Sequence, residues 1–280
     1  MKVIKVNKMS LQKTEMRNPE SMNLDKMSTE EMVRLVVKAN YEAVRAAEEA
    51  SAEIAKAVDA IAEAFDGGHR LFYLGAGTSG RLGVLDASEC PPTFGVSYEQ
   101  VVGIIAGGKE RMFRAGENAE DSYESGVAAI DEHGVSAGDV VVGISAAGGA
   151  KYVIGALERA KEIGCITVGV CNNPDTPIFK VSDINIFADT GAEVLTGSTR
   201  LKAGTAQKIV LNALTTCAMA KTGKVYENMM INLAPSNEKL KLRVIRITKE
   251  ILGCSEDEAI ARLDANDWNI RRAVTAAKEA

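Results

Sequence analysis

The sequence predicts an α/β protein built on an open, doubly wound parallel sheet of five strands. One observation is that short apolar runs alternate with helical patterns, which is typical of parallel strands joined by right-handed crossovers. A second is the glycine-rich loop that directly follows the first apolar run, and a third is that helical segments flank this region on both sides. Ligands of such sheets bind at the carboxyl ends of the strands, so we expect the functional site there.

The elements follow one another along the chain. The expected strands lie at 70–75, 101–106, 139–145, 165–171 and 184–189, with helices between them near 79–88, 118–132 and 151–163. Three parts are expected: an N-terminal arm with helices over 1–66, the α/β domain over 67–235 and a C-terminal helical extension over 236–280. Within the extension, Ser255 and Glu258 have the spacing of a capping box, and Trp268 and Ile270 are the expected core.

The sequence of the N-terminal part predicts an arm followed by helices. Residues 9–27 are polar and have few apolar anchors, so they form an arm without a core of its own. Ser28 and Glu31 have the spacing of a capping box that opens a helix. An alanine-rich helix over 40–65 and an amphipathic one over 236–252 offer more apolar surface than one open sheet covers. We therefore expect a homodimer, with the arm against the partner near its phosphate loop and a shared active site.

Composition limits the classes of function. The 280 residues carry 33 basic and 38 acidic side chains and a formal charge of −5, which provides no field for nucleic acid or an anionic membrane. The five cysteines lack C-x-x-C spacing, and their odd number suits a reducing compartment. No signal peptide or membrane-spanning run is apparent, so we expect a cytoplasmic protein. The two histidines, His69 and His133, each adjoin a glycine in an apparent turn, so a histidine-based metal site is not expected.

The glycine loop after the first expected strand has the features of an anion site. Gly75, Gly77 and Gly80 allow close backbone approach at the start of a helix, and Thr78 and Ser79 add hydroxyl donors. The same glycines fit the G-x-G-x-x-G pattern of dinucleotide sites. Such a site wants an acidic residue at the end of the next strand, and this chain has glycines there, which favours a sugar phosphate. A turn that only packs helix on strand is the remaining alternative.

A second polar segment, residues 191–208, runs into an apolar helix. Its hydroxyls and cations, among them Ser198 and Lys202, predict a second contact with an anion. The alternative is a solvated helix start capped by Ser198 or Thr199.

Three stretches of the sequence carry a resemblance to a known family. They are Thr14-Glu15 through Asn18, Ser21, Leu24-Asp25 and Ser28-Thr29-Glu30, then Gly75 to Pro92, and Gly191 to Lys208. In these stretches the chain resembles the N-acetylmuramic acid 6-phosphate etherases, which are built on the sugar isomerase (SIS) fold. A vertebrate regulator of glucokinase shares the motifs, so the fold match alone does not establish catalysis.

The resemblance implies a cytoplasmic homodimer that needs no metal or cofactor and serves peptidoglycan recycling. Its substrate would be a phosphorylated amino sugar, N-acetylmuramic acid 6-phosphate, and its products N-acetylglucosamine 6-phosphate and D-lactate. The family removes the C2 proton of the open-chain aldehyde, expels lactate from C3 and adds water to the resulting enal. Such chemistry needs two carboxylates, one for the proton on carbon and one for the departing oxygen.

Position by position, the resemblance assigns Glu89 as the acid that protonates lactate and Glu120 as the base. The residues predicted to hold the phosphosugar are Gly77, Thr78, Ser79, Gly80, Ser145, Gly148, Ser198 and Lys202. One block departs from the family, which has Ser-Gly-Arg-Thr-Pro where residues 147–151 read Ala-Gly-Gly-Ala-Lys. Each hydrogen bond lost to a charged phosphate costs about 1.5–3 kcal/mol. A phosphosugar-binding regulator without turnover and an aldose-ketose phosphate isomerase therefore stay open as alternatives.

Overall fold

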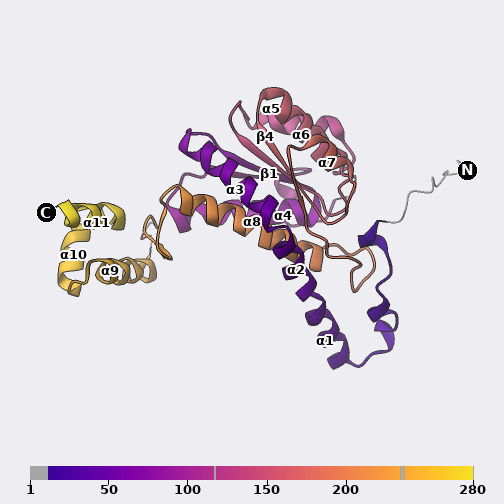
Figure 1. The fold of residues 1–280 in the computed structure, drawn as a ribbon, viewed down its shortest axis with the longest axis horizontal. Coiled ribbons are helices and arrows are strands. Elements are labelled where there is room, and N and C mark those ends of the chain that lie inside the picture. The colour runs from indigo at the N-terminus through magenta and orange to yellow at the C-terminus, as the bar shows by residue number, and fades with distance from the viewer. Residues whose placement is uncertain (1–11, 117, 234, 236, 280) are drawn as a thin grey trace, which may run out of the picture.

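The computed structural model describes residues 12–116, 118–233, 235 and 237–279, and its centre is the predicted five-stranded parallel sheet (Figure 1). The strands are β1 (Leu71–Gly75), β2 (Val101–Ile105), β3 (Val140–Ile144), β4 (Ile166–Cys171) and β5 (Ile184–Phe187). Their order is β2-β1-β3-β4-β5, and each neighbouring pair is parallel. Because β2 lies on one side of β1 and β3 on the other, the carboxyl ends of these strands flank the switch point where ligands of such sheets bind.

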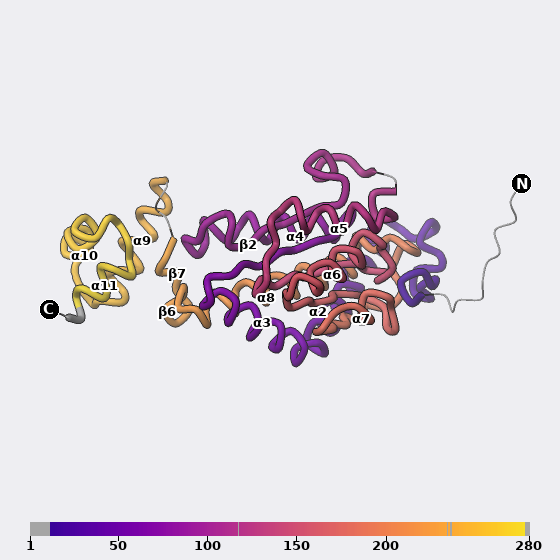
Figure 2. The backbone as a smooth tube through the Cα atoms, turned by 90° about the horizontal axis from the view of Figure 1, so that it is seen from above, coloured from indigo at the N-terminus to yellow at the C-terminus, as the bar shows by residue number. Residues whose placement is uncertain are grey.

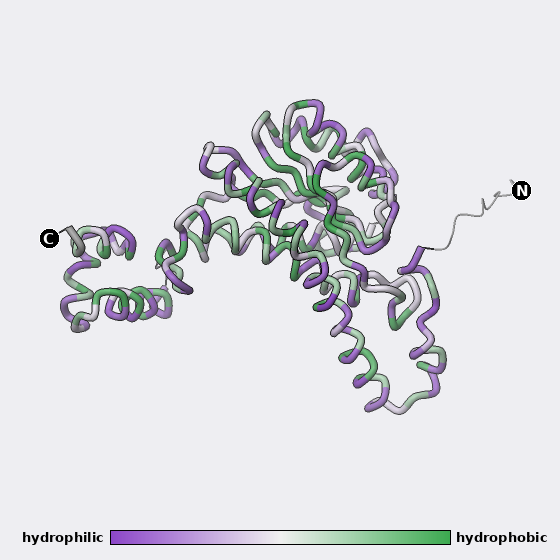
Figure 3. The backbone as a smooth tube through the Cα atoms, in the orientation of Figure 1, coloured by the Kyte–Doolittle hydropathy of each residue, from purple (hydrophilic) through white to green (hydrophobic). Residues whose placement is uncertain are grey.

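Helices cover both faces of the sheet, because successive strand residues point to opposite apolar cores. Leu71 and Tyr73 of β1 face a core shared with α3, α4 and α8, and Phe72 and Leu74 face one shared with α5, α6 and α7. All four side chains are fully buried, and Figure 3 shows hydrophobic residues along the central strands. The helices are α3 (Ser51–Asp66), α4 (Gly77–Phe94), α5 (Tyr123–Glu132), α6 (Lys151–Ile163), α7 (Pro177–Val181) and α8 (Lys202–Lys221).

Helix α4 is longer than the stretch of 79–88 that the sequence predicts. Pro91 and Pro92 lie inside its last turns. Each proline removes one backbone N–H but keeps a helical φ, so the helix loses two hydrogen bonds near its end and still continues. It ends at Gly95, whose φ of 63° is left-handed and whose N–H donates to the Pro91 carbonyl at 2.9 Å. Glu89 is therefore held on a helix rather than in a loop.

The helix expected over 40–65 is divided. Its two pieces meet at Ala50, where φ and ψ of −85° and 3° depart from helical values. The Ser51 hydroxyl donates to the Glu48 carbonyl and satisfies an acceptor at the end of the first piece. The N-terminal helices are α1 (Thr29–Ala39), which begins at the predicted capping box of Ser28 and Glu31, then α2 (Tyr41–Glu49) and α3.

The N-terminal arm folds onto the sheet of its own chain. Thr14 is fully buried: its N–H donates to Asn173 Oδ1 at 3.3 Å, and its hydroxyl accepts from Asn173 Nδ2 at 2.9 Å. Gln12 Nε2 donates to the Ala147 carbonyl at 2.8 Å. The expectation that the arm lies against a partner is wrong for these residues, because hydrogen bonds to loops of the same sheet replace the core the arm lacks. Three short 3₁₀ turns form it: η1 (Lys13–Glu15), η2 (Pro19–Ser21) and η3 (Leu24–Lys26). Residues 9–11 lie outside the described residues.

The C-terminal part has an apolar core of its own. Ile231 and Leu233 pack with the helices of this part, Ile270 is fully buried, and Trp268 packs against the same core half-buried, as predicted. Figure 2 shows the three helices set apart from the sheet, at the end opposite the arm. The elements are β6 (Val225–Tyr226), β7 (Met229–Met230), α9 (Glu238–Leu252), α10 (Glu256–Asp264), which begins at the predicted capping box of Ser255 and Glu258, and α11 (Ile270–Glu279).

Candidate active site

A cavity of about 380 Å³ lies at the carboxyl ends of β1 and β3. Five of the predicted site residues line it, namely Gly77, Thr78, Ser79, Glu120 and Ser145. The arm contributes Glu15, and the segment before α8 contributes Gly197 and Thr199. No lysine or arginine lines this cavity within the described chain. An anion bound here would therefore be held by hydroxyls and backbone N–H groups rather than by an ion pair.

The glycine loop brings β1 and α4 into close contact. A Cβ at Gly80 would lie 2.3 Å from the Gly75 carbonyl oxygen, so only glycine fits there. Gly77 has a φ of 54°, in the left-handed region, and begins α4. The first N–H groups of α4 lie at the cavity, where the helix dipole favours an anion. Gly80 shapes this loop from inside the helix and is not in the cavity wall.

The Ser79 hydroxyl takes part in a buried relay that the sequence did not reveal. Ser79 Oγ donates to Gln207 Oε1 at 2.9 Å, and Gln207 Nε2 donates to Asn172 Oδ1 at 3.0 Å. Asn172 Nδ2 then donates to the Ala188 carbonyl at 2.8 Å. The relay joins the glycine loop to α8 and to the ends of β4 and β5. It leaves the lone pairs of Ser79 for a donor, while backbone N–H groups serve an anion.

The loop after β3 presents one hydroxyl to the cavity. The Gly148 N–H donates to Ser145 Oγ at 3.0 Å, which leaves the Ser145 hydroxyl proton for a ligand. Gly148 itself has a φ of 70°, and a Cβ there would lie 2.5 Å from Thr176 Cβ. Gly148 therefore makes the turn but does not line the cavity. Ala146, Ala147, Gly149 and Ala150 complete this wall without polar side chains.

Glu120 lies in the loop before α5. Its carbonyl accepts from the Tyr152 N–H at 3.0 Å, which fixes the backbone against α6. Its carboxylate has no hydrogen-bond or ion-pair partner among the described residues. Glu120 also lines an adjoining cavity of about 370 Å³, with Arg81 and Arg111 in its wall. The Arg111 Nε is buried and has no hydrogen-bond partner in the part of the chain that the structure describes. Two carboxylates, Glu120 and Asp121, and two guanidinium groups thus line the space beside the glycine loop.

Glu89 lies far from this constellation in the same chain. It is exposed on α4 about 18 Å along the helix from Gly77, at 1.5 Å per residue. Leu85, one turn earlier, is also exposed, at 44%. One chain therefore does not bring Glu89 and Glu120 together.

The segment before α8 is divided between two cavities. Ser198 lies in a turn in which its N–H donates to the Leu195 carbonyl at 2.9 Å, and Thr199 rather than Ser198 lines the cavity that holds Glu120. Lys202 is 5% exposed and lines a separate cavity on the other side of η1.

Across the described residues, no three His, Cys, Asp or Glu side chains lie close enough together to hold a metal ion. No helix among them is long and apolar enough to cross a bilayer.

The sheet order and the glycine-loop cavity define a protein of the SIS class. Residues 116–217 match the SIS domain, and residues 53–161 match the glucokinase regulatory protein N-terminal SIS domain. A solved protein of Escherichia coli CFT073 superposes with a TM-score of 0.52 at 15% identity, over 72% of this chain and 97% of that one. A phosphoheptose isomerase from Francisella tularensis gives a TM-score of 0.51 at 13% identity, over 69% of this chain and all of that one. Residues 249–277 match a UBA-like domain.

Sequence relatives narrow the class to a family. N-acetylmuramic acid 6-phosphate etherase of Actinobacillus pleuropneumoniae serotype 7 is 49% identical over 93% of this chain and 86% of its own length. That of Symbiobacterium thermophilum is also 49% identical, over 94% of this chain and 87% of the relative. The chain belongs to the N-acetylmuramic acid 6-phosphate etherase family.

Proposed function

We propose that this protein cleaves the D-lactyl ether of N-acetylmuramic acid 6-phosphate to N-acetylglucosamine 6-phosphate and D-lactate. The observation that carries the proposal is that Glu120 faces the same cavity as the phosphate-type glycine loop, in a chain 49% identical to enzymes of that name. The sugar phosphate binds the first N–H groups of α4, Thr78 and the Ser145 hydroxyl. This places the reacting carbons beside Glu120.

The reaction is an elimination followed by hydration. Glu120 takes the C2 proton of the open-chain aldehyde, the electrons form the C2–C3 double bond, and the C3–O bond to lactate breaks. An acid protonates the departing oxygen, and the same group then activates the water that adds to C3 while C2 regains a proton. Glu120 forms no ion pair with any described residue, so its carboxylate is available to take the proton.

The acid in this proposal is Glu89 of a second copy. Glu89 is exposed and about 18 Å along α4 from the glycine loop, which is too far to serve the cavity of its own chain. A two-fold axis beside α4 makes the relation mutual, so that each chain lends Glu89 to the other. The exposed Leu85 on the same face supplies apolar surface for that contact.

An apolar groove supports the homodimer. It has a volume of about 610 Å³ and lies between α2, α3 and α8, with Val44, Ile54, Val58 and Ile209 among its walls. Val44 is 54% exposed. Isolated surface valines are ordinary, but a groove lined by many apolar side chains is typical of an interface. We infer that a second copy of this chain covers it.

The adjoining cavity suits the lactyl carboxylate. The substrate has two anionic groups, and the glycine loop accounts for the phosphate. Arg81 and Arg111 lie in the wall beside Glu120, and a guanidinium group is a donor suited to a carboxylate. In this arrangement the scissile ether lies between the two anion sites.

The test is D-lactate release from N-acetylmuramic acid 6-phosphate by the full chain. We expect turnover by the wild type and by Glu124→Gln, an exposed carboxylate on α5, and a loss in Glu120→Gln of about 10²- to 10⁴-fold. A folded wild-type protein that releases no lactate at high enzyme concentration contradicts the proposal.

One observation favours a second candidate, a phosphosugar-binding regulator without turnover. The wall formed by Ala146, Ala147, Gly149 and Ala150 contributes no side-chain donor to the phosphate. A regulator would be stabilised against heat by a sugar 6-phosphate without consuming it. If each sugar phosphate that raises the melting temperature is also turned over, this candidate fails.

We assign the enzyme to the cytoplasm and to peptidoglycan recycling. All five cysteines are free in the structure, and Cys90, Cys165 and Cys171 are buried. Buried free thiols suit a reducing compartment. N-acetylglucosamine 6-phosphate would be the product that rejoins amino sugar metabolism.

A further inference from the structure

A second polar cavity, of about 410 Å³, lies on the far side of the arm from the candidate active site. Its walls come from η1 and η2 of the arm, the start of α2, the loop after β5 and the first residue of α8. Turn η1 separates the two cavities, because Lys13 lines this one and Glu15 lines the other. The proposed etherase reaction uses none of the side chains in this cavity.

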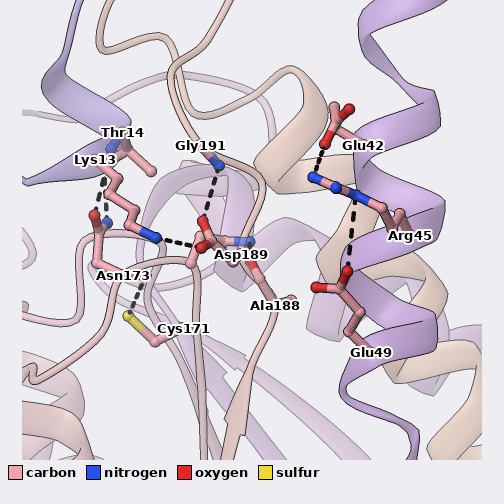
Figure 4. Close-up of polar contacts among 11 residues, drawn as sticks. Lys13, Thr14, Glu42, Arg45, Glu49, Cys171, Asn173, Ala188, Asp189 and Gly191 are labelled. Carbon is pink, nitrogen blue, oxygen red and sulfur yellow. Dashed lines mark hydrogen bonds and ion pairs between the residues drawn. The ribbon is translucent and has the colours of Figure 1, made fainter.

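Three ion pairs form the rim. Lys13 pairs with Asp189, Arg45 with Glu42, and Lys38 with Glu20. Figure 4 shows Lys13 reaching Asp189 on one side, and Arg45 between Glu42 and Glu49 on the other. These side chains are at least a quarter exposed, so each pair contributes little stability and its charges already have partners.

Lys202 is different, because it is 95% buried and its ammonium forms no hydrogen bond or ion pair with any described residue. Glu193, whose carboxylate interacts with the Lys202 charge, is fully buried and accepts the backbone N–H groups of Lys202 at 3.2 Å and of Ala203 at 3.0 Å. Burial raises the pKa of Glu193, while those N–H groups and the Lys202 charge lower it. Glu193 therefore caps α8, and the Lys202 ammonium lies at the cavity without a hydrogen-bond acceptor among the described residues.

Thr190 adds a second unsatisfied group to the same wall. It is 2% exposed, and its Oγ1 has no hydrogen-bond partner among residues 12–116, 118–233, 235 and 237–279. A buried hydroxyl without a partner is costly unless a ligand pairs with it, and the Lys202 ammonium in the same wall also lacks an acceptor among the described residues.

We propose that this cavity binds a small monocarboxylate, with its carboxylate on Lys202 Nζ and beside Thr190. The three rim cations are neutralised by Asp189, Glu20 and Glu42, so Lys202 is the one cation of the lining left over, which matches a single negative charge better than a dianion such as phosphate. Asn18 in the wall donates to the Ala192 carbonyl at 3.2 Å and accepts from the Glu20 N–H at 3.0 Å, which leaves its second amide proton for a ligand hydroxyl. The class therefore includes α-hydroxy acids, of which D-lactate, the product of the proposed reaction, is one.

The test is an NMR titration of the full chain that follows the backbone amides of Gly191, Ala192 and Ala203, with acetate, D-lactate and inorganic phosphate as probes. We expect saturable shifts of these amides with the two carboxylates and weaker binding of phosphate. Absence of saturable shifts with either carboxylate overturns the proposal, and tighter binding of phosphate overturns the assigned class.

Two variants locate the ligand. Lys202→Met and Thr190→Val are each expected to weaken carboxylate binding about tenfold or more. Lys208→Met, an exposed lysine on the same helix, and Ser145→Ala, in the other cavity, are expected to leave it unchanged. If Lys202→Met does not fold, Thr190→Val of matched volume decides. The site is contradicted if Thr190→Val, and Lys202→Met where it folds, bind the carboxylates as the wild type does. It is also contradicted if Ser145→Ala binds them more weakly. The titration needs no turnover, so its outcome is independent of the proposed etherase activity.

Discussion

Ser79 Oγ donates a 2.9 Å hydrogen bond to Gln207 Oε1, and this contact ties the glycine loop after β1 to helix α8. Gln207 is 1% exposed and also donates to Asn172. The orientation of the Ser79 hydroxyl is thus set by residues from three separate parts of the chain. The contact explains how a loop of small residues keeps one geometry at the cavity.

Replacing Gln207 by leucine removes both hydrogen bonds and leaves the Ser79 hydroxyl without its acceptor and Asn172 Oδ1 without its donor. We expect the free energy of unfolding to fall by about 1–3 kcal/mol and KM for the phosphosugar to rise. Urea unfolding and steady-state kinetics measure the two effects. The control is Lys208→Met, the next residue on α8, which is exposed. An unchanged unfolding midpoint in Gln207→Leu would show that the relay has no structural role.

Substitutions of the two proposed catalytic carboxylates are expected to distinguish removal of the C2 proton from release of lactate. Glu89→Gln should block lactate release yet allow exchange of the C2 hydrogen with deuterated water, because Glu120 remains. Glu120→Gln should impair both. Mass spectrometry of recovered substrate and a D-lactate assay distinguish the steps. The opposite pattern would exchange the roles of the two residues.

Mixed dimers test whether Glu89 acts across the interface. Random pairing of Glu89→Gln and Glu120→Gln subunits makes half of the dimers mixed. If the sites are shared, each mixed dimer has one intact site, and turnover returns to about a quarter of the wild-type value. If both carboxylates acted within one chain, neither site of a mixed dimer would be intact. Turnover no higher than that of the separate variants would therefore refute the shared site.

Burying a charge in the apolar groove should separate the subunits. Val44→Asp places a carboxylate among Ile54, Val58 and Ile209, and an unpaired buried charge opposes association. We expect light scattering to report a monomer and D-lactate release to fall with it. Ala52→Asp, on an exposed position of α3 outside the groove, is the matched control. A dimeric Val44→Asp protein would move the interface elsewhere.

Arg111→Met should affect only ligands that carry the lactyl group. We expect weaker binding of N-acetylmuramic acid 6-phosphate by about tenfold or more, because a hydrogen bond between charged groups is lost. Thermal stabilisation by N-acetylglucosamine 6-phosphate, which lacks the lactyl carboxylate, should not change. The exposed Arg114→Met is the control. Equal weakening of both ligands would place Arg111 at the phosphate instead.

Asp139 should make the free energy of unfolding decrease as the pH falls. Burial raises the pKa of Asp139, but hydrogen bonds from Ser136 and Arg70 outweigh this and hold the pKa below its usual value. The unfolded chain therefore takes up this proton first, and the stabilisation present above a pH of about 4 is lost as the pH falls through the folded pKa. Asp139→Asn should lower stability at pH 7 by about 1–3 kcal/mol and flatten its dependence on pH below 5.

Urea unfolding at several pH values measures this effect. Asp131→Asn removes an exposed ion pair with Arg159 and should change stability by less than about 1 kcal/mol. An Asp139→Asn protein with the wild-type pH profile would contradict the role of this carboxylate.

The sequence by itself determined the sheet and the position of the phosphate-type loop. Strand residues such as Leu71 and Phe72 are apolar on both faces, and helical patterns between the runs leave only a parallel arrangement. Gly75 and Gly80 marked the loop because close backbone contact requires residues without a Cβ. These patterns are local, so each can be recognised within one short segment of the sequence.

Only the tertiary structure decided which residues share a cavity. Glu15 and Thr199 meet Glu120 from segments far apart in the chain, and no local pattern records such a meeting. Lys202, itself one of the predicted phosphosugar contacts, lines a different cavity from Glu120, because η1 of the arm lies between the two cavities. Gln207 became visible only through its buried contact with Ser79. Packing between distant segments sets these relations, whereas sequence patterns report the periodicity of single elements.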